Sequence, residues 1–183
     1  MATSAEGTPP TITRLRERPR GRVEVDLDGV PWRTLPAEVV VRCGLLAGCA
    51  LDRETARALA RDLRRSKALA RAAQALRHRD LSRQALATRL PAPAREEALD
   101  VLERSGYLDD ARTAAGRAAW LAERGWGDEA IRVRLEQEGF VGEPLAGALE
   151  DLEPEPDRAK ALRERGRTER WLAARGFEVA PDL

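Results

Sequence analysis

Residues 52–79 read DRETARALARDLRRSKALARAAQALRHR, a run of 28 residues without proline or glycine. Alanine, leucine and arginine are strong helix formers, and Asp52 is the type of residue that caps a helix N-terminus. Apolar residues such as Leu59 and Leu63 recur at helical spacing along this run. The sequence therefore predicts one long helix that begins after Asp52.

The rest of the chain has the composition of a helical protein. Hydrophobic residues make up 43% of the chain, aromatic residues only 4% and charged residues 34%. This composition favours well-solvated helices with narrow apolar seams and excludes a large β-sandwich. One β element is predicted: residues 23–35 alternate apolar and polar side chains around Asp28-Gly29, a dipeptide typical of a type I′ hairpin turn.

A short internal repeat organises the helices. Residues 135–140 read LEQEGF and residues 172–177 read LAARGF. Each repeat would contain three helices, and stacked repeats form an elongated, curved solenoid. We therefore predict an all-α fold of tandem three-helix repeats with a small N-terminal β-hairpin. Its expected parts are a disordered basic tail (1–22), the hairpin with a short helix (23–51), a linking helix with the first repeat (52–107), the second repeat (108–153) and a truncated third repeat (154–183).

The sequence offers little for catalysis. The single histidine, His78, lies between Arg77 and Arg79 and lacks partners for a catalytic triad or a metal site. Asp109-Asp110 is interpreted as a helix cap, not as a metal-binding pair. No glycine-rich phosphate motif, signal peptide or membrane span is found. We expect a cytoplasmic protein that is not an enzyme and uses no cofactor or metal.

Charge is strongly segregated along the chain. The net charge is +1, yet residues 53–95 carry +9 and residues 96–157 carry −11. Arginine pairs equally well with carboxylates and with phosphates, so charge leaves the partner open between protein and nucleic acid. A basic face is predicted on the long helix, formed by Arg57, Arg61, Arg64, Lys67 and Arg71. Further candidate partner-binding residues are Arg79, Arg83, Arg132, Arg134 and Trp171.

Two further predictions concern the tail and the aromatic residues. Within Pro19-Arg20-Gly21-Arg22, the residues Arg20, Gly21 and Arg22 match the core of a peptide that binds the DNA minor groove; a solvated tail is the alternative. Other aromatic residues are predicted to pack between helices, whereas Trp171 is predicted to be partly bare. The predicted packing residues are Tyr107, Trp120, Trp126 and Phe140.

The stretch from residue 29 to residue 140 resembles the RecX family of bacterial recombinase regulators. The most specific residues are Gly106-Tyr107-Leu108-Asp109-Asp110 and Arg124-Gly125-Trp126-Gly127, followed by Gly139-Phe140. The resemblance implies a protein that lies in the groove of a RecA filament on single-stranded DNA, and we expect a monomer. There it would block filament growth, ATP turnover and strand exchange during recombinational repair.

The chain departs from that family pattern in two places. Leu90-Pro91-Ala92-Pro93 shortens the second helix of the first repeat, and the third repeat is truncated. A different function also fits the residues without any recombinase. In this alternative, the protein is a stand-alone DNA-binding protein that uses its Arg-rich tail and its basic helix.

Overall fold

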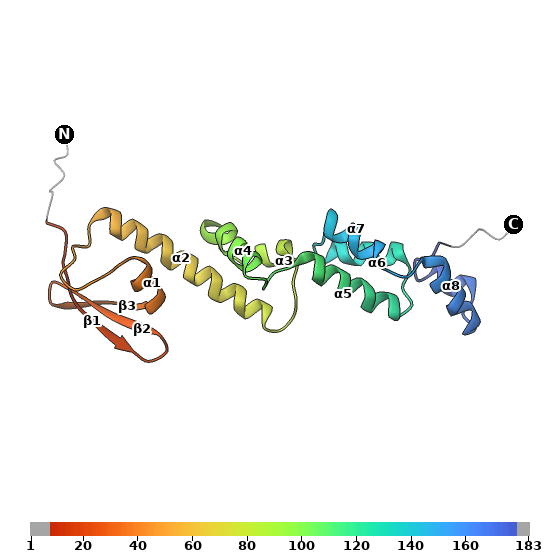
Figure 1. Ribbon diagram of the computed structural model, residues 1–183, viewed down its shortest axis with the longest axis horizontal. Coiled ribbons are helices and arrows are strands. Elements are labelled where there is room, and N and C mark those ends of the chain that lie inside the picture. Colours follow the sequence, from red (N-terminus) through yellow and green to blue (C-terminus); the bar gives the residue numbers. More distant parts are fainter. Residues whose placement is uncertain (1–7, 179–183) are drawn as a thin grey trace, which may run out of the picture. The chain divides into compact units, whose positions relative to one another are not determined.

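The computed structural model describes residues 8–178 (Figure 1), which form a small antiparallel sheet followed by helices. The chain divides into two compact units. The first extends to Ala70 and includes Pro91–Arg95; the second comprises Arg71–Leu90 and the chain from Glu96 onward. The elements are β1 (Ile12–Arg18), β2 (Arg22–Leu27), β3 (Val30–Pro36), α1 (Ala37–Arg42), α2 (Arg53–Leu76), α3 (Arg83–Ala87), the 3₁₀ turn η1 (Ala92–Ala94), α4 (Arg95–Arg104), α5 (Asp110–Glu123), α6 (Asp128–Gln137), α7 (Glu143–Glu150), α8 (Glu155–Glu164) and α9 (Glu169–Ala173).

The N-terminal sheet has the strand order β1-β2-β3. The predicted hairpin is confirmed as β2 and β3, because Asp28 and Gly29 adopt φ values of 48° and 82° in the turn between them. Strand β1 was not expected, since residues 1–22 are predicted to be a disordered tail. That prediction is wrong for residues 12–18: Ile12 is fully buried opposite Leu27. Interspersed arginines conceal this short apolar alternation in the sequence.

The minor-groove peptide is a second correction in this region. Arg20 and Gly21 adopt φ values of 64° and 63° and form the tight turn between β1 and β2. An arginine-glycine-arginine peptide in the minor groove must be extended, and a left-handed turn is not. Arg20, Gly21 and Arg22 therefore form the tip of a hairpin; residues 1–7 lie outside the described part of the chain.

The core of the first unit lies between the sheet and the helices that follow it. Helix α2 confirms the predicted long helix, and the Asp52 carboxylate accepts a hydrogen bond from the Thr55 N–H at 2.8 Å. This hydrogen bond lowers the pKa of the Asp52 carboxyl. Leu59 is the residue of α2 that enters this core. The buried core residues are Ile12, Val23, Val25, Leu35, Val39, Val40, Leu45, Leu51 and Leu59.

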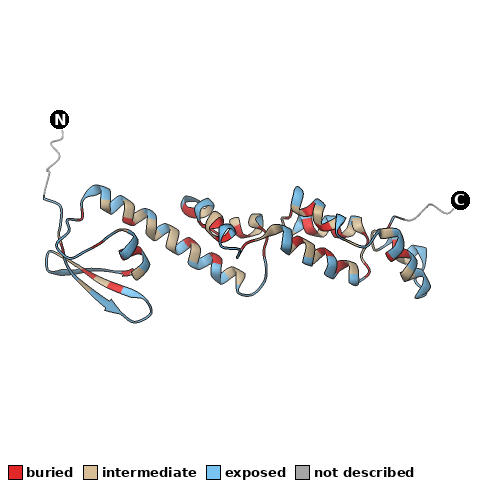
Figure 2. Cartoon of the chain, in the orientation of Figure 1, coloured by how far each residue is buried: buried red, intermediate tan, exposed pale blue. Residues whose placement is uncertain are grey.

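Helices of the second unit bury their apolar faces in local clusters, shown by the red positions in Figure 2. Helices α5, α6 and α7 share one cluster, which contains Ile131, Leu135 and Phe140. Helices α8 and α9 close over a smaller cluster with Ala159, Leu172 and Phe177. This cluster has fewer buried residues than the one shared by α5, α6 and α7. The fold is thus mostly helical with one small sheet.

Two junctions in the second unit are built alike. At the first, the Ser82 hydroxyl before α3 donates to the Glu138 carbonyl at the end of α6, at 2.7 Å. At the second, the Gly127 N–H before α6 donates to the Arg175 carbonyl at the end of α9, at 2.9 Å. In both cases a helix end with a following glycine packs onto the start of an earlier helix, α6 onto α3 and α9 onto α6.

The same two junctions share a second contact. The first N–H of α3, on Arg83, donates to the Asp110 carboxylate at 2.8 Å, and the first N–H of α6, on Asp128, donates to the Glu155 carboxylate at 2.6 Å. The acceptor in each case is the first residue of a later helix, Asp110 of α5 and Glu155 of α8. The first N–H of the helix is thus satisfied by a side chain distant in sequence, where the usual cap comes from the adjoining residue.

We expect Asp110 to support this contact mainly as a hydrogen-bond acceptor. Burial raises the pKa of the Asp110 carboxyl, the Arg83 N–H opposes this shift, and the nearby Glu103 carboxylate adds to it. Asp110→Ala should lower the free energy of unfolding by about 1 kcal/mol, the typical cost of losing a cap. Asp110→Asn keeps an acceptor without a charge and should match or exceed wild-type stability at neutral pH.

The pH dependence separates these two variants. Because the folded-state pKa of Asp110 lies above its unfolded value, the wild-type carboxyl favours folding most below the unfolded pKa. That contribution is lost as the pH rises through the folded-state pKa. Urea unfolding should therefore show any gain from Asp110→Asn at neutral pH and none in acid. A loss with Asp110→Asn as large as with Asp110→Ala would contradict this interpretation.

Candidate partner-binding surfaces

The basic face of α2 consists of Arg57, Arg61, Arg64, Lys67 and Arg71, all of which are exposed. At 100° per residue, these positions fall within about 120° of one another around the helix. Leu59, Ala68 and Ala72 are the buried residues of the same helix. Within the first unit the structure exposes Arg57, Arg61, Arg64 and Lys67 on α2, whereas Arg71 belongs to the second unit.

These five cations are available to an external anion. Within residues 8–178, none of them forms an ion pair with a carboxylate. Arg42 shows the contrast, because its guanidinium lies 3.8 Å from the Asp62 carboxylate. Unpaired guanidinium groups on a rigid helix can bind carboxylates or phosphates in two-pronged geometry. The basic face of α2 is thus a candidate binding surface for an anionic partner.

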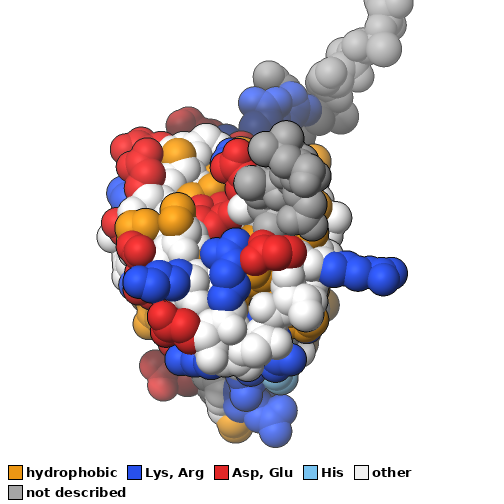
Figure 3. Space-filling view, turned by 90° about the vertical axis from the view of Figure 1, so that its right-hand side faces the viewer, with side chains coloured by type: hydrophobic (Ala, Val, Ile, Leu, Met, Phe, Trp, Pro, Cys, Tyr) orange, Lys and Arg blue, Asp and Glu red, His pale blue; other side chains and the backbone are white. Residues whose placement is uncertain are grey.

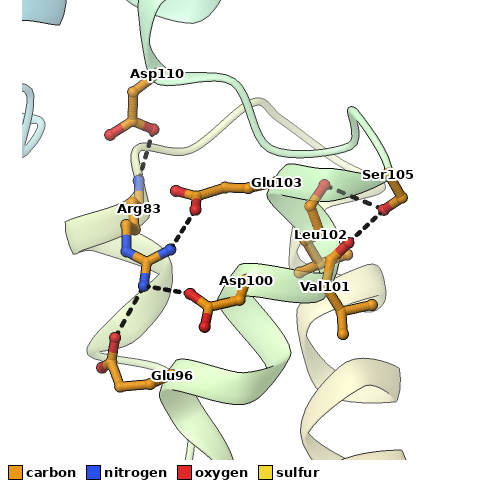
Figure 4. A network of polar contacts seen from close by, with 8 residues as sticks. All are labelled: Arg83, Glu96, Asp100, Val101, Leu102, Glu103, Ser105 and Asp110. Atoms are coloured by element: carbon orange, nitrogen blue, oxygen red, sulfur yellow. Dashed lines mark hydrogen bonds and ion pairs between the residues drawn. The ribbon is translucent and has the colours of Figure 1, made fainter.

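Arg83, another predicted partner-binding residue, is by contrast paired within the protein. Its guanidinium points toward α4 and contacts three carboxylates, those of Glu96 at 2.9 Å, Asp100 at 3.0 Å and Glu103 at 2.6 Å (Figure 4). Burial alone would lower the pKa of Arg83, but these hydrogen bonds outweigh it and raise the pKa. Arg83 joins α3 to α4 inside the first repeat, so its charge is already neutralised.

Arg134 and Trp171 also form cation–π contacts within the protein. The Arg134 guanidinium lies 3.6 Å from the centre of the Trp126 ring, and Arg175 lies 4.4 Å from the same ring. Arg175 also lies 4.7 Å from the centre of the Trp171 ring. This alternating stack of guanidiniums and indoles joins α6 to α9 and the residues next to them. The half-buried Trp171 is therefore largely a packing residue at the junction.

Arg79 and Arg132 remain accessible but do not belong to the basic face of α2. Arg132 pairs on the surface with Glu129 at 3.4 Å, one turn earlier on α6. Exposed pairs at this spacing contribute little to stability and leave the cation available. Arg79 follows the end of α2 and lines a groove that the sequence does not predict.

This groove is open, has a volume of about 890 Å³ and lies within the second unit. Residues before and within α3, along α5 and at the end of α6 form its walls. Four arginines line it together with Asp80, Glu136 and Glu138. The arginines are Arg79, Arg89, Arg112 and Arg117. Mixed charge of this kind complements a protein surface that also carries both signs.

Trp120 lines the groove and is 40% exposed, so the prediction that it packs between helices is wrong. Arg117 and Arg124 lie 4.4 Å and 3.7 Å from the centre of its ring. Arg117 also forms a two-pronged contact with Glu138, the shortest distance being 2.7 Å. An indole held by two guanidiniums at a groove is typical of a binding hot spot.

The remaining aromatic residues divide between core and surface. Phe140 is buried and Trp126 is half-buried, as predicted. Tyr107 is 74% exposed, because Leu108 takes the buried position next to it. Its exposure contradicts the predicted packing role, and periodicity alone cannot distinguish the two neighbours.

The described residues lack other kinds of site. No group of three or more His, Cys, Asp or Glu residues among them could hold a metal ion. No helix within residues 8–178 is long and apolar enough to cross a membrane. Figure 3 shows acidic and basic side chains interspersed over the C-terminal helices, without a large patch of one sign.

Comparison with known proteins tests the family resemblance. No known family profile matches the sequence, and no curated protein is similar to it in sequence. A solved crystal structure of regulatory protein RecX superposes on the chain with a TM-score of 0.77, covering 92% of this chain and 95% of that one. This chain has the RecX fold. The sequence identity is 23%, so the similarity to RecX is one of fold.

The motifs that carry the resemblance to RecX lie where the fold needs them. Gly106 adopts φ 72° at the end of α4, and Asp109 caps α5 by accepting from the Arg112 N–H at 2.9 Å. Gly125 adopts φ 77° at the end of α5, and Gly127 begins α6. The resemblance to RecX therefore rests on residues that end and begin helices, and not on the exposed cations.

Proposed function

We propose that the protein is a RecX-like regulator of a RecA-type recombinase, acting by binding and not by catalysis. In this proposal it binds the groove of the recombinase filament on single-stranded DNA. It then limits filament growth, ATP turnover and strand exchange, and so modulates recombinational repair. The main support is the fold shared with RecX over 92% of the chain.

Two surfaces support a filament as the partner. The unpaired cations on α2 can bind phosphates or carboxylates. The groove near Trp120 carries four arginines and three carboxylates, which suits a protein surface of mixed charge. A nucleoprotein filament offers both kinds of surface to one ligand, whereas free DNA offers only phosphate.

We also propose that the repeats stack as a solenoid. The junctions at Ser82 and Gly127 are similar, since in each a helix start donates a hydrogen bond to a carbonyl at the end of a later helix. This similarity supports regular stacking of the repeats. A monomer in the cytoplasm is the simplest form for a ligand of a filament groove. In this arrangement the truncated third repeat limits how far one molecule reaches along the filament.

Titration of the single-strand-dependent ATPase of the cognate recombinase tests the proposal. Wild-type protein should suppress ATP turnover at substoichiometric concentration. Arg57→Gln/Arg61→Gln/Arg64→Gln removes three cations of α2 and retains helix-forming residues. We expect this variant to need at least about tenfold more protein for half-inhibition, which corresponds to about 1.4 kcal/mol of binding free energy.

A matched control removes three exposed cations elsewhere. Arg104→Gln/Lys160→Gln/Arg165→Gln changes the net charge equally at positions without an ion pair in the described structure. This control should inhibit like the wild type. The competing candidate, a stand-alone DNA-binding protein, predicts no effect on ATP turnover and tight, salt-sensitive DNA binding. That combination of results would reject the regulator proposal.

A further inference from the structure

The N-terminal sheet has one apolar face and one charged face. Val23, Val25 and Leu35 fill the core on the apolar face. Successive residues of a strand point to opposite faces, so the residues between them form the charged face. In the β1–β2 register, Arg14 lies opposite Asp26, Arg16 opposite Glu24 and Arg18 opposite Arg22.

Cations outnumber their partners on this charged face. The Glu24 carboxylate is shared by Arg18, whose Nε lies at 2.9 Å, and Arg16, at 3.7 Å. Arg14 and Arg20 have no carboxylate partner among the described residues. All four arginines are exposed. The face therefore presents more positive charge than the sheet itself can neutralise.

The hairpin tip concentrates this charge at a cost to folding. Arg18 and Arg22 lie directly opposite each other, and like charges at such positions destabilise a sheet. Arg20 occupies the left-handed region with φ 64°, which is unfavourable for a residue with a side chain. Neither arrangement helps the hairpin to form. An external anion that pairs with these arginines would offset both costs.

Strand β3, which pairs with β2, carries an exposed aromatic residue, Trp32. The β2–β3 register shifts between Val25, which pairs with Arg33, and Asp26, which pairs with Pro31. Trp32 is the extra residue of this bulge and is 40% exposed. Bulges reorient side chains and recur at functional sites. Trp32 therefore provides an accessible indole on strand β3, with the Arg33 guanidinium 5.7 Å from the centre of its ring.

We propose that the charged face of this sheet, with its hairpin tip and Trp32, binds single-stranded nucleic acid. Alternate residues of β1 are about 7 Å apart, so Arg14, Arg16 and Arg18 form a regular row suited to a phosphate backbone. Exposed aromatic residues on sheets stack with unpaired bases. A row of cations with a stacking platform fits a single strand better than it fits an acidic protein surface.

The charge of the whole unit favours the same partner. By sequence, the first unit carries 14 basic and 9 acidic side chains, for +5, whereas the second carries 18 and 22, for −4. Positive charge steers a polyanion toward the first unit. The inference does not depend on the proposed regulation of a recombinase, since it concerns the isolated protein and nucleic acid alone.

Fluorescence anisotropy of labelled oligothymidine, titrated with full-length protein without recombinase, tests the inference. Arg14→Gln/Arg16→Gln/Arg20→Gln spares Arg18 and Arg22, which hold internal hydrogen bonds. Losing three phosphate contacts should weaken binding about 100-fold near 0.1 M salt and reduce the slope of log K against log salt by about 2. Trp32→Leu should weaken binding about tenfold through lost stacking.

The controls decide between a site and general charge. Arg104→Gln/Lys160→Gln/Arg165→Gln removes equal charge from the second unit and should bind like the wild type. Circular dichroism and urea unfolding verify that every variant is folded. Wild-type binding by the β1 triple variant, or an equal loss in the control, would overturn the inference. Equal affinity for single-stranded and duplex DNA, together with no effect of Trp32→Leu, would also overturn it. The site would then bind the phosphate backbone without distinguishing single strands from duplexes.

Discussion

Gly127→Ala is expected to lower the free energy of unfolding by about 3 kcal/mol, at the upper end of the usual cost of overpacking. A Cβ at Gly127 would lie 2.3 Å from the Gly176 carbonyl oxygen and 2.4 Å from the Phe177 nitrogen. Both are backbone atoms, which cannot rotate away. Gly127 has φ −79°, so the effect comes from this close approach and not from a left-handed backbone.

Gly116→Ala is the matched control for this substitution. Gly116 lies within α5, and a Cβ there would meet no atom within 4 Å. Alanine should raise stability by about 0.5–1 kcal/mol, because it is the better helix former. Urea unfolding measures both variants, and limited proteolysis should show earlier cleavage after residue 153 in Gly127→Ala alone. Equal stability of the two variants would mean that the third repeat does not dock as described.

Arg158→Ala should produce a loss of similar size, about 3 kcal/mol, as expected for breaking a buried ion pair. Arg158 is only 8% exposed. Its guanidinium donates to the Glu153 carbonyl at 2.8 Å, to the Trp126 carbonyl at 3.0 Å and, most closely, to the Asp128 carboxylate. Alanine would leave these acceptors without their donor and open a gap between the second and third repeats.

Two variants on the same helix check this explanation. Arg163 pairs with Glu169 on the protein surface, so Arg163→Ala should leave the free energy of unfolding nearly unchanged. Arg158→Lys keeps the charge but cannot reproduce the planar set of donors, so it should recover only part of the stability. Urea unfolding at constant salt measures all three variants. Full stability of Arg158→Lys would show that charge alone holds the junction.

Local features of the fold follow closely from the sequence. The caps at Asp52 and Asp109 and the turn at Asp28-Gly29 all occur where the sequence predicts them. Each depends on a short-range hydrogen bond or on one residue's backbone preference, so neighbouring residues suffice to predict it. The fold resemblance to RecX rests on the same kind of residue.

Strand β1 could not be predicted from neighbouring residues. Its residues 12–18 contain only two apolar side chains between arginines, too few for a clear pattern. They form a strand because Ile12 and Leu15 pair with Leu27 and Val25. A strand gains its stability from partners distant in sequence, and these partners become visible only in the folded chain.

The same distinction governs the candidate binding residues. Helical spacing alone places Arg57, Arg61 and Arg64 on one face, and the structure leaves them exposed. Spacing cannot show that carboxylates of α4 form ion pairs with Arg83, or that the Arg134 guanidinium stacks on the Trp126 ring. An arginine's role depends on which distant groups lie within about 4 Å of its guanidinium. The sequence thus determined the helices, caps and charge of this protein, while tertiary packing decided which cations remain free for a partner.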